Sequence, residues 1–168
     1  VTAERKPNQP NILLITIDTL RADHLGIYGY TKIKTPNIDK LADKGTVFTQ
    51  HICQQPLTTP SHASILTSTY PITNGVEKNN VLLTDAEITI AEILKEYGYM
   101  NGAFVSAFPL NAYTTMLDQG FHHYDDKLIV IDYLPGLVPR YLAGLTVIRN
   151  FVLHLKVMGY VERRADET

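Results

Sequence analysis

The sequence is poor in several features that define whole classes of protein. It has a single cysteine, Cys53, which excludes a disulfide within the chain. The formal net charge is −2 and no block of basic residues occurs, so binding to nucleic acid through bulk charge is not expected. The sequence has no run of about twenty apolar residues, the length of a transmembrane helix, and no repeat or low-complexity segment.

The composition that remains fits one globular domain. Hydrophobic residues make up 45% of the chain and charged residues 19%, which separates it from disordered chains. Its 168 residues are enough for one hydrophobic core. Short β-branched runs predict strands at residues 11–17 and 46–52, and a third strand is expected at residues 101–106. We expect Cys53 to be a buried thiol beside the second of these and not a catalytic group.

Helices are predicted by their end signals. A threonine stands before a proline at Pro36 and at Pro60, the pattern of a cap followed by a first helical residue. Leu41 of the first helix is expected to face inward. Thr84 or Asp85 is expected to cap a third helix. Because helices alternate with strands, the pattern favours an α/β fold with a parallel sheet and right-handed crossovers.

Two stretches carry chemistry. Asp18 ends the first predicted strand, where ligands of open α/β sheets gather, and its carboxylate could bind a metal ion. The alternative is that Asp18 caps the following loop or pairs with Arg21. In residues 56–67, Thr58 and Thr59 precede the helix at Pro60. A hydroxyl at a helix start suits an anionic ester, and the alternative is an ordinary helix cap.

The sequence resembles sulfatases of the alkaline phosphatase superfamily. The resemblance runs in the family's order from Asn11 to Asp126. It rests on Ile17-Asp-Thr-Leu-Arg-Ala-Asp-His24, Thr35-Pro-Asn-Ile-Asp-Lys-Leu-Ala42, Pro56-Leu-Thr-Thr-Pro-Ser-His-Ala-Ser-Ile-Leu-Thr67 and Gly120-Phe-His-His-Tyr-Asp-Asp126. The resemblance implies a three-layer αβα fold with a mainly parallel sheet, incomplete in this chain. It also implies a hydrolase of sulfate or phosphate esters that depends on a divalent metal, either calcium, zinc or manganese.

The resemblance assigns roles residue by residue. Thr58 stands where most sulfatases have the Cys or Ser that becomes formylglycine, and His62 stands in the place of their Arg. Threonine cannot become that aldehyde, so the implied reaction is direct in-line attack by Thr58, with Asp18 and Thr58 as metal ligands. His62 would support the nucleophile or protonate a leaving group. Asn79 follows Thr58 by 21 positions and would donate its amide to an ester oxygen.

Alternatives remain at each of these positions. Asn79 could close its own turn, or Asn80 could be the relevant residue. A lone His62 on a helix is more often structural. His122 and His123 are adjacent in an extended segment, where side chains alternate, so we interpret them as structural. For the whole protein, the alternatives are a phosphodiesterase or phosphonate hydrolase, a phosphoethanolamine-type transferase, and a non-catalytic binding module with the same fold.

The domain organisation follows from where the resemblance begins and fades. Residues 1–10 are expected to be a lead-in, without a signal peptide of their own. Residues 11–126 would be the N-terminal part of the catalytic domain, and residues 127–168 a helical segment that precedes the rest of it. The missing half would supply further metal ligands, so we expect these residues alone to be inactive. A homo-oligomer is compatible with a small-molecule ester substrate, and the compartment stays open, with export slightly favoured.

Overall fold

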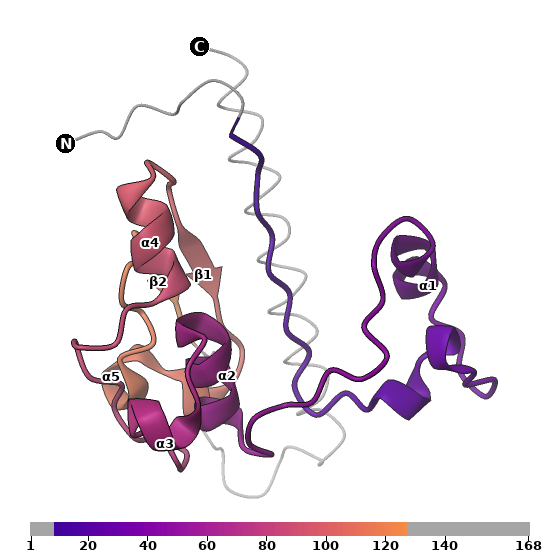
Figure 1. Cartoon of the computed structure of the whole chain (residues 1–168), viewed down its shortest axis with the longest axis horizontal. Helices are drawn as coiled ribbons and strands as arrows, with labels where there is room; N and C mark the ends of the chain where they lie inside the picture. Colours follow the sequence, from indigo (N-terminus) through magenta and orange to yellow (C-terminus); the bar gives the residue numbers. More distant parts are fainter. Residues whose placement is uncertain (1–8, 128–168) are drawn as a thin grey trace, which may run out of the picture. The chain divides into compact units, whose positions relative to one another are not determined.

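A computed structural model describes residues 9–127. These residues form two compact units, residues 9–53 and residues 54–127, and each is described by itself (Figure 1). The helices expected in residues 127–168 lie outside the described residues, apart from Lys127. In the described part of the chain, no helix has the length and apolar character needed to cross a membrane.

In the first unit, one polar cluster holds the short helices together. The unit contains the 3-10 helices η1 (Ala22–His24) and η2 (Gly26–Tyr28) and the helix α1 (Pro36–Ala42). The Thr35 hydroxyl accepts from the Gly26 amide at 2.9 Å and donates to Asp39 at 3.0 Å. The same Asp39 oxygen accepts from the Ile27 amide at 3.0 Å. Threonine and proline therefore open α1 as expected, and the cluster ties α1 to η2.

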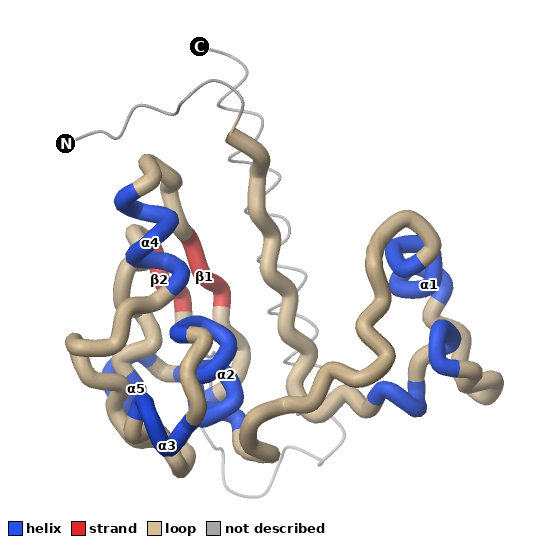
Figure 2. Tube along the Cα trace, in the orientation of Figure 1, coloured by secondary structure: helices blue, strands red, loops and turns tan. Residues whose placement is uncertain are grey.

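Four expectations for the first unit are wrong. Residues 11–17 and 46–52 form no strand (Figure 2), although their residue types suit one. A strand needs a neighbour for its backbone hydrogen bonds, and β-branched composition does not supply that neighbour. Cys53 is exposed, and Leu41 is 71% exposed because nothing in its unit covers that side of α1.

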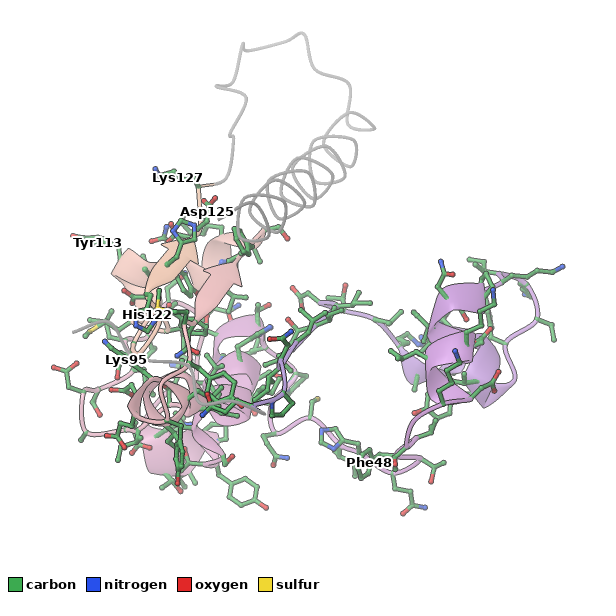
Figure 3. The ribbon with its side chains drawn as sticks, turned by 90° about the horizontal axis from the view of Figure 1, so that it is seen from above. Phe48, Lys95, Tyr113, His122, Asp125 and Lys127 are labelled. Carbon is green, nitrogen blue, oxygen red and sulfur yellow. The ribbon has the colours of Figure 1, made fainter. Side chains whose placement is uncertain are left out.

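The apolar side chains of these two segments are correspondingly uncovered within the described residues. Those of the first segment are 55–75% exposed, namely Ile12, Leu13, Leu14, Ile15 and Ile17. Phe48, labelled in Figure 3, is 70% exposed in the second. Both segments thus keep the composition of buried strands without their burial.

The second unit holds most of the regular structure. Its helices are α2 (Thr58–Thr67), α3 (Pro71–Asn74), α4 (Ile90–Glu96), the 3-10 helix η3 (Phe108–Leu110) and α5 (Ala112–Thr115). Its strands are β1 (Gly102–Phe104) and β2 (His123–Asp125). The two strands pair in parallel, with Ala103 opposite Tyr124. The expected strand at 101–106 is confirmed, as is an α/β class with parallel pairing, here of two strands.

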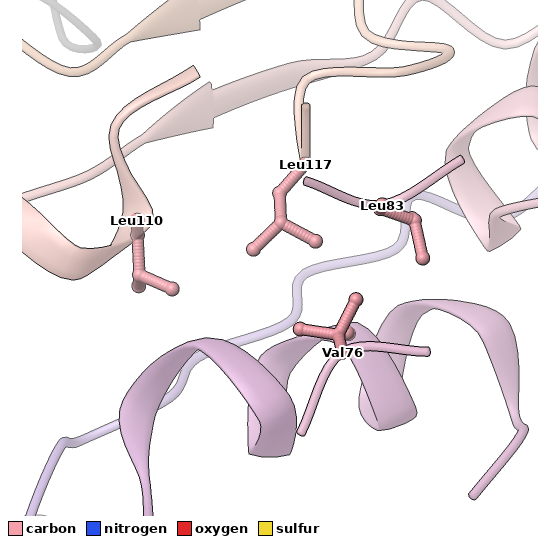
Figure 4. Close-up of a cluster of buried hydrophobic side chains, with 5 residues drawn as sticks. Val76, Leu83, Leu110 and Leu117 are labelled. Atoms are coloured by element: carbon pink, nitrogen blue, oxygen red, sulfur yellow. The ribbon is translucent and has the colours of Figure 1, made fainter. Parts of the chain in front are cut away.

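A small hydrophobic core lies between these elements. It consists of buried residues from α2, from η3 and from two connecting segments, namely Ala63, Val76, Leu83, Leu110 and Leu117 (Figure 4). Leu66, Val81, Val105 and Ala107 pack against it. Side chains from four separate stretches therefore fix where α2 and the loops around it lie.

The cap of α4 differs from the one expected. Thr89, and not Thr84 or Asp85, is the N-cap. Its hydroxyl accepts from the Glu92 amide at 3.2 Å, and Glu92 accepts from the Thr89 amide at 2.8 Å. This reciprocal pair is a capping box. Thr89 also donates to the Gln119 carbonyl at 3.0 Å, which ties the start of α4 to the segment before β2.

Candidate active site at the start of helix α2

The N-terminus of α2 places Thr58 at the first helical position. The N-cap is Leu57, whose side chain cannot accept a hydrogen bond, and its carbonyl accepts from the Ser61 amide at 3.1 Å. The expectation that Thr58 and Thr59 precede the helix as caps is therefore wrong, because the helix starts two residues before Pro60. Pro60 is the third helical residue, where its missing N–H removes a donor that the helix could not pair itself.

Asn79 supplies the hydrogen-bond acceptor that Leu57 lacks. Its Oδ1 atom accepts from the Thr59 amide at 2.9 Å, so a loop residue twenty positions away caps α2. The expectation that Asn79 closes its own turn finds no such bond among the described residues. Because Oδ1 is engaged at the helix, the carboxamide presents its two Nδ2 hydrogens to other acceptors.

His62 lies one helical turn after Thr58 and bonds back to it. The Nδ1 atom is 2.8 Å from the Thr58 carbonyl oxygen. Since a carbonyl only accepts, Nδ1 carries a proton and donates it. The imidazole is thereby held against the backbone of Thr58.

Asp18 belongs to the other unit, residues 9–53. It lies in an exposed turn in which the Leu20 amide donates to the Ile17 carbonyl at 3.4 Å and Thr19 has a φ of 58°. The Arg21 guanidinium, the expected alternative partner of Asp18, bonds to Asp23, at 2.9 and 2.5 Å. The hydrogen bond from Arg21 lowers the pKa of Asp23.

The donor chemistry of the candidate residues fits a hard divalent cation only in part. Asp18 and Thr58 offer oxygen atoms, which calcium and magnesium prefer. Residues 9–127 contain no group of three or more His, Cys, Asp or Glu side chains arranged to hold a metal ion. Calcium takes about six to eight ligands, so either oxygen would be a small part of a coordination shell.

Comparison with known proteins shows the family to which this sequence belongs. The family model described as sulfatase matches residues 10–137, which is most of the chain. The chain belongs to the sulfatase family. It is 41% identical to human steryl-sulfatase over 103 residues, covering 55% of this chain and 18% of that protein.

Two further relatives have the same extent of similarity. The chain is 40% identical to human arylsulfatase D over 105 residues, covering 56% of this chain and 18% of that protein. It is also 40% identical to the ulvan-active sulfatase of Formosa agariphila over 99 residues, covering 59% of this chain and 19% of that protein. This sulfatase-family chain therefore spans about a fifth of the length of the curated relatives it matches.

The sequence did not indicate the structural role of Thr59. Thr59 was expected to be a cap, yet it is fully buried and bonds to Asn79, Asn80 and Pro109. No spacing rule links residue 59 to residues 79 and 109, because those contacts depend on the fold of two loops. The only signal in the sequence was a β-branched polar residue beside the predicted nucleophile.

Proposed function

We propose that the full-length protein carrying this chain is a metal-dependent hydrolase of sulfate esters in which Thr58 is the nucleophile. The observation that best supports this is the start of α2, where Thr58 opens the helix and Asn79 is fixed to the next residue at 2.9 Å. Three relatives named as sulfatases support the ester class. We also propose that residues 11–126 are the N-terminal part of the catalytic domain.

The proposed reaction has two steps. The Thr58 Oγ attacks sulfur in line, a Thr58 O–S bond forms, and the S–O bond to the alcohol breaks. The leaving oxygen takes up the proton that the Thr58 hydroxyl loses, and His62 is the candidate carrier of that proton between the two oxygens. Water then attacks the same sulfur, the Thr58 O–S bond breaks, and sulfate leaves with the hydroxyl restored. Asn79 Nδ2 and backbone amides at the start of α2 would stabilise the equatorial oxygens.

Asp18 and Thr58 are the proposed protein ligands of the metal in this chain. A divalent cation bound to a hydroxyl lowers its pKa and makes it a better nucleophile. The remaining ligands would come from outside residues 9–127, which is why we propose that this chain alone is inactive. Calcium, zinc and manganese are to be distinguished by elemental analysis of the purified full-length protein, with Asp18→Asn as the variant expected to lose bound metal.

Thr58 gives the sharpest test of the proposal. In the full-length protein, Thr58→Ala should abolish hydrolysis of 4-nitrophenyl sulfate, and Thr58→Ser should retain part of it, because serine keeps the hydroxyl. Thr67→Ala is a matched control on the same helix, since its hydroxyl bonds to Ala63 and Thr69 at the far end. Undiminished turnover by Thr58→Ala would remove Thr58 from the mechanism.

Asn79→Asp separates the two uses of the Asn79 side chain. The carboxylate keeps an acceptor for the Thr59 amide, and its charge is favourable at a helix N-terminus. It loses the Nδ2 donors and repels an anionic ester. Activity should therefore fall by about 10²-fold or more, the usual effect of losing one such donor, while the denaturation midpoint stays close to that of the unchanged protein. If Asn79→Asp instead lowered the denaturation midpoint as clearly as it lowered activity, the loss of activity would reflect unfolding, and the donor role would be contradicted.

A second candidate function is hydrolysis of phosphate or phosphonate esters. Thr58 favours it, because a threonine cannot become the formylglycine of most sulfatases and must act through its own hydroxyl. Comparing kcat/KM for 4-nitrophenyl sulfate and an aryl phosphate diester decides between the two. A transferase would instead require an acceptor alcohol for turnover, and a binding module would show neither turnover nor bound metal.

A further inference from the structure

Thr59 connects three separate parts of the second unit. Its amide donates to Asn79 Oδ1 at 2.9 Å. Its hydroxyl donates to the Pro109 carbonyl at 2.5 Å and accepts from the Asn80 amide at 3.3 Å. One residue thus contacts the side chain of Asn79, the backbone that follows it, and the turn η3.

Burial of Thr59 holds the geometry of these hydrogen bonds. Thr59 has no solvent-exposed surface, so water does not compete for its hydroxyl, and buried hydrogen bonds of this kind hold their geometry strongly. Asn80 has a φ of 59°, a left-handed conformation that Asn tolerates better than most residues. The bond from the Asn80 amide fixes the loop in that bend. Leu110, next to Pro109, belongs to the hydrophobic core, so the network continues into rigid packing.

We propose that Thr59 is a positioning residue that sets the direction of the Asn79 amide at the start of α2. This inference rests on the proposed function, in which Asn79 donates to an ester oxygen. The Thr59 amide bonds to Asn79 Oδ1, and the Thr59 hydroxyl bonds to the backbone amide of Asn80. The side chain of Asn79 and the backbone that follows it are therefore both fixed to the residue beside Thr58. In this role Thr59 acts through Asn79 and not on the ester itself.

The experiment is a double-mutant cycle in the full-length protein with 4-nitrophenyl sulfate. Thr59→Val keeps the volume and shape but removes the hydroxyl, and Thr59→Ser keeps the hydroxyl. We expect Thr59→Val to lower kcat/KM by about 10- to 100-fold, part of the loss expected for the donor itself, and Thr59→Ser to stay within about threefold. In an Asn79→Ala background, Thr59→Val should cause no further loss, because residues that act as a unit are not additive.

A purely structural role of Thr59 would change stability alone, so the denaturation midpoint is measured alongside kcat/KM. Thr59→Val leaves the Pro109 carbonyl and the Asn80 amide without partners, so its denaturation midpoint should fall in both backgrounds. Thr115→Val is the matched control: its side chain is also fully buried and its hydroxyl donates to the Asn111 carbonyl at 2.8 Å. Thr115→Val should lower the midpoint and leave kcat/KM unchanged. Should Thr59→Val fail to fold, Thr59→Cys, which keeps a weak donor, replaces it in the same cycle.

The possible outcomes distinguish a failure of the inference about Thr59 from a failure of the proposed hydrolase function. If the Thr59→Val loss is the same with and without Asn79, Thr59 does not act through Asn79 and the inference is overturned, while the proposed function stands. If Asn79→Ala has unchanged kcat/KM, the inference fails together with the donor role of Asn79. If Thr58→Ala remains active, the proposed mechanism fails before Thr59 is considered.

Discussion

Gly120 is the position where one methyl group should do the most damage to the second unit. Its φ is +85°, and a Cβ built on it would overlap the backbone nitrogen of Glu92 and lie 2.6 Å from the Ala91 carbonyl carbon. These atoms belong to the helix α4 and cannot turn aside as a flexible side chain would. The Asn101 side chain also bonds to both sides of the contact, to the Ala91 carbonyl at 2.6 Å and to the Gly120 carbonyl at 3.3 Å.

The magnitude for Gly120→Ala is the sum of two effects. A residue with a Cβ in the left-handed conformation costs about 1–2 kcal/mol, and forcing an extra methyl group into a packed contact costs about 1–3 kcal/mol. We therefore expect a loss of about 2–5 kcal/mol. This is a large fraction of the roughly 5–15 kcal/mol that stabilises a typical protein.

Gly75 isolates the first of these effects. It has a φ of +77° and no atom within 4 Å of a built Cβ, so Gly75→Ala should lose about 1–2 kcal/mol. Urea denaturation of both variants, followed by far-ultraviolet circular dichroism, gives the difference. Equal midpoints for Gly120→Ala and Gly75→Ala would show that the approach to α4 relaxes freely, and would refute the steric argument.

Three further changes test the second unit by the same denaturation assay. Thr89→Ala should cost about 1–2 kcal/mol as the loss of a cap, whereas Thr84→Ala should have little effect; the reverse order would contradict the observed capping box. Ser64 Oγ is buried without a hydrogen-bond partner within the described residues, so Ser64→Ala should be neutral or stabilising, and a loss would mean that the hydroxyl is paired. Burial raises the pKa of Tyr124; an unfolded chain therefore releases this proton first, near pH 10, and stability should fall above that pH less steeply in Tyr124→Phe.

Helix positions could be predicted from the sequence where the signal is local. Threonine and proline at 35–36 mark the start of α1, and the segment after Pro60 is helical as expected. The true cap of α4 also had a local signal, since Thr89-Ile-Ala-Glu92 has the spacing of a capping box. The stronger turn composition around Thr84 concealed it. These errors displace an element by a few residues and leave the order of helices intact.

Strands were harder to predict because their hydrogen bonds are not local. Residues 101–106 contain one β-branched residue and residues 11–17 contain four, yet β1 pairs with β2, whereas residues 11–17 pair with no strand in the part of the chain that the structure describes. Composition reports the suitability of a segment for a sheet, and the partner decides whether a strand forms. The same reasoning explains Cys53, whose expected burial depended on the strand at 46–52.

Asn79 shows why a resemblance could name a residue without giving its structural task. The family pattern implied an amide donor at this position, and that role stays a prediction. The structure adds that Oδ1 caps α2 through the Thr59 amide, which the sequence could not reveal because Leu57 is the cap and the bond spans twenty residues. If Asn79 also donates to the ester as proposed, its side chain would link substrate binding to the position of Thr58. Variants that keep the acceptor and lose the donor are therefore more informative than alanine, because alanine removes both functions at once.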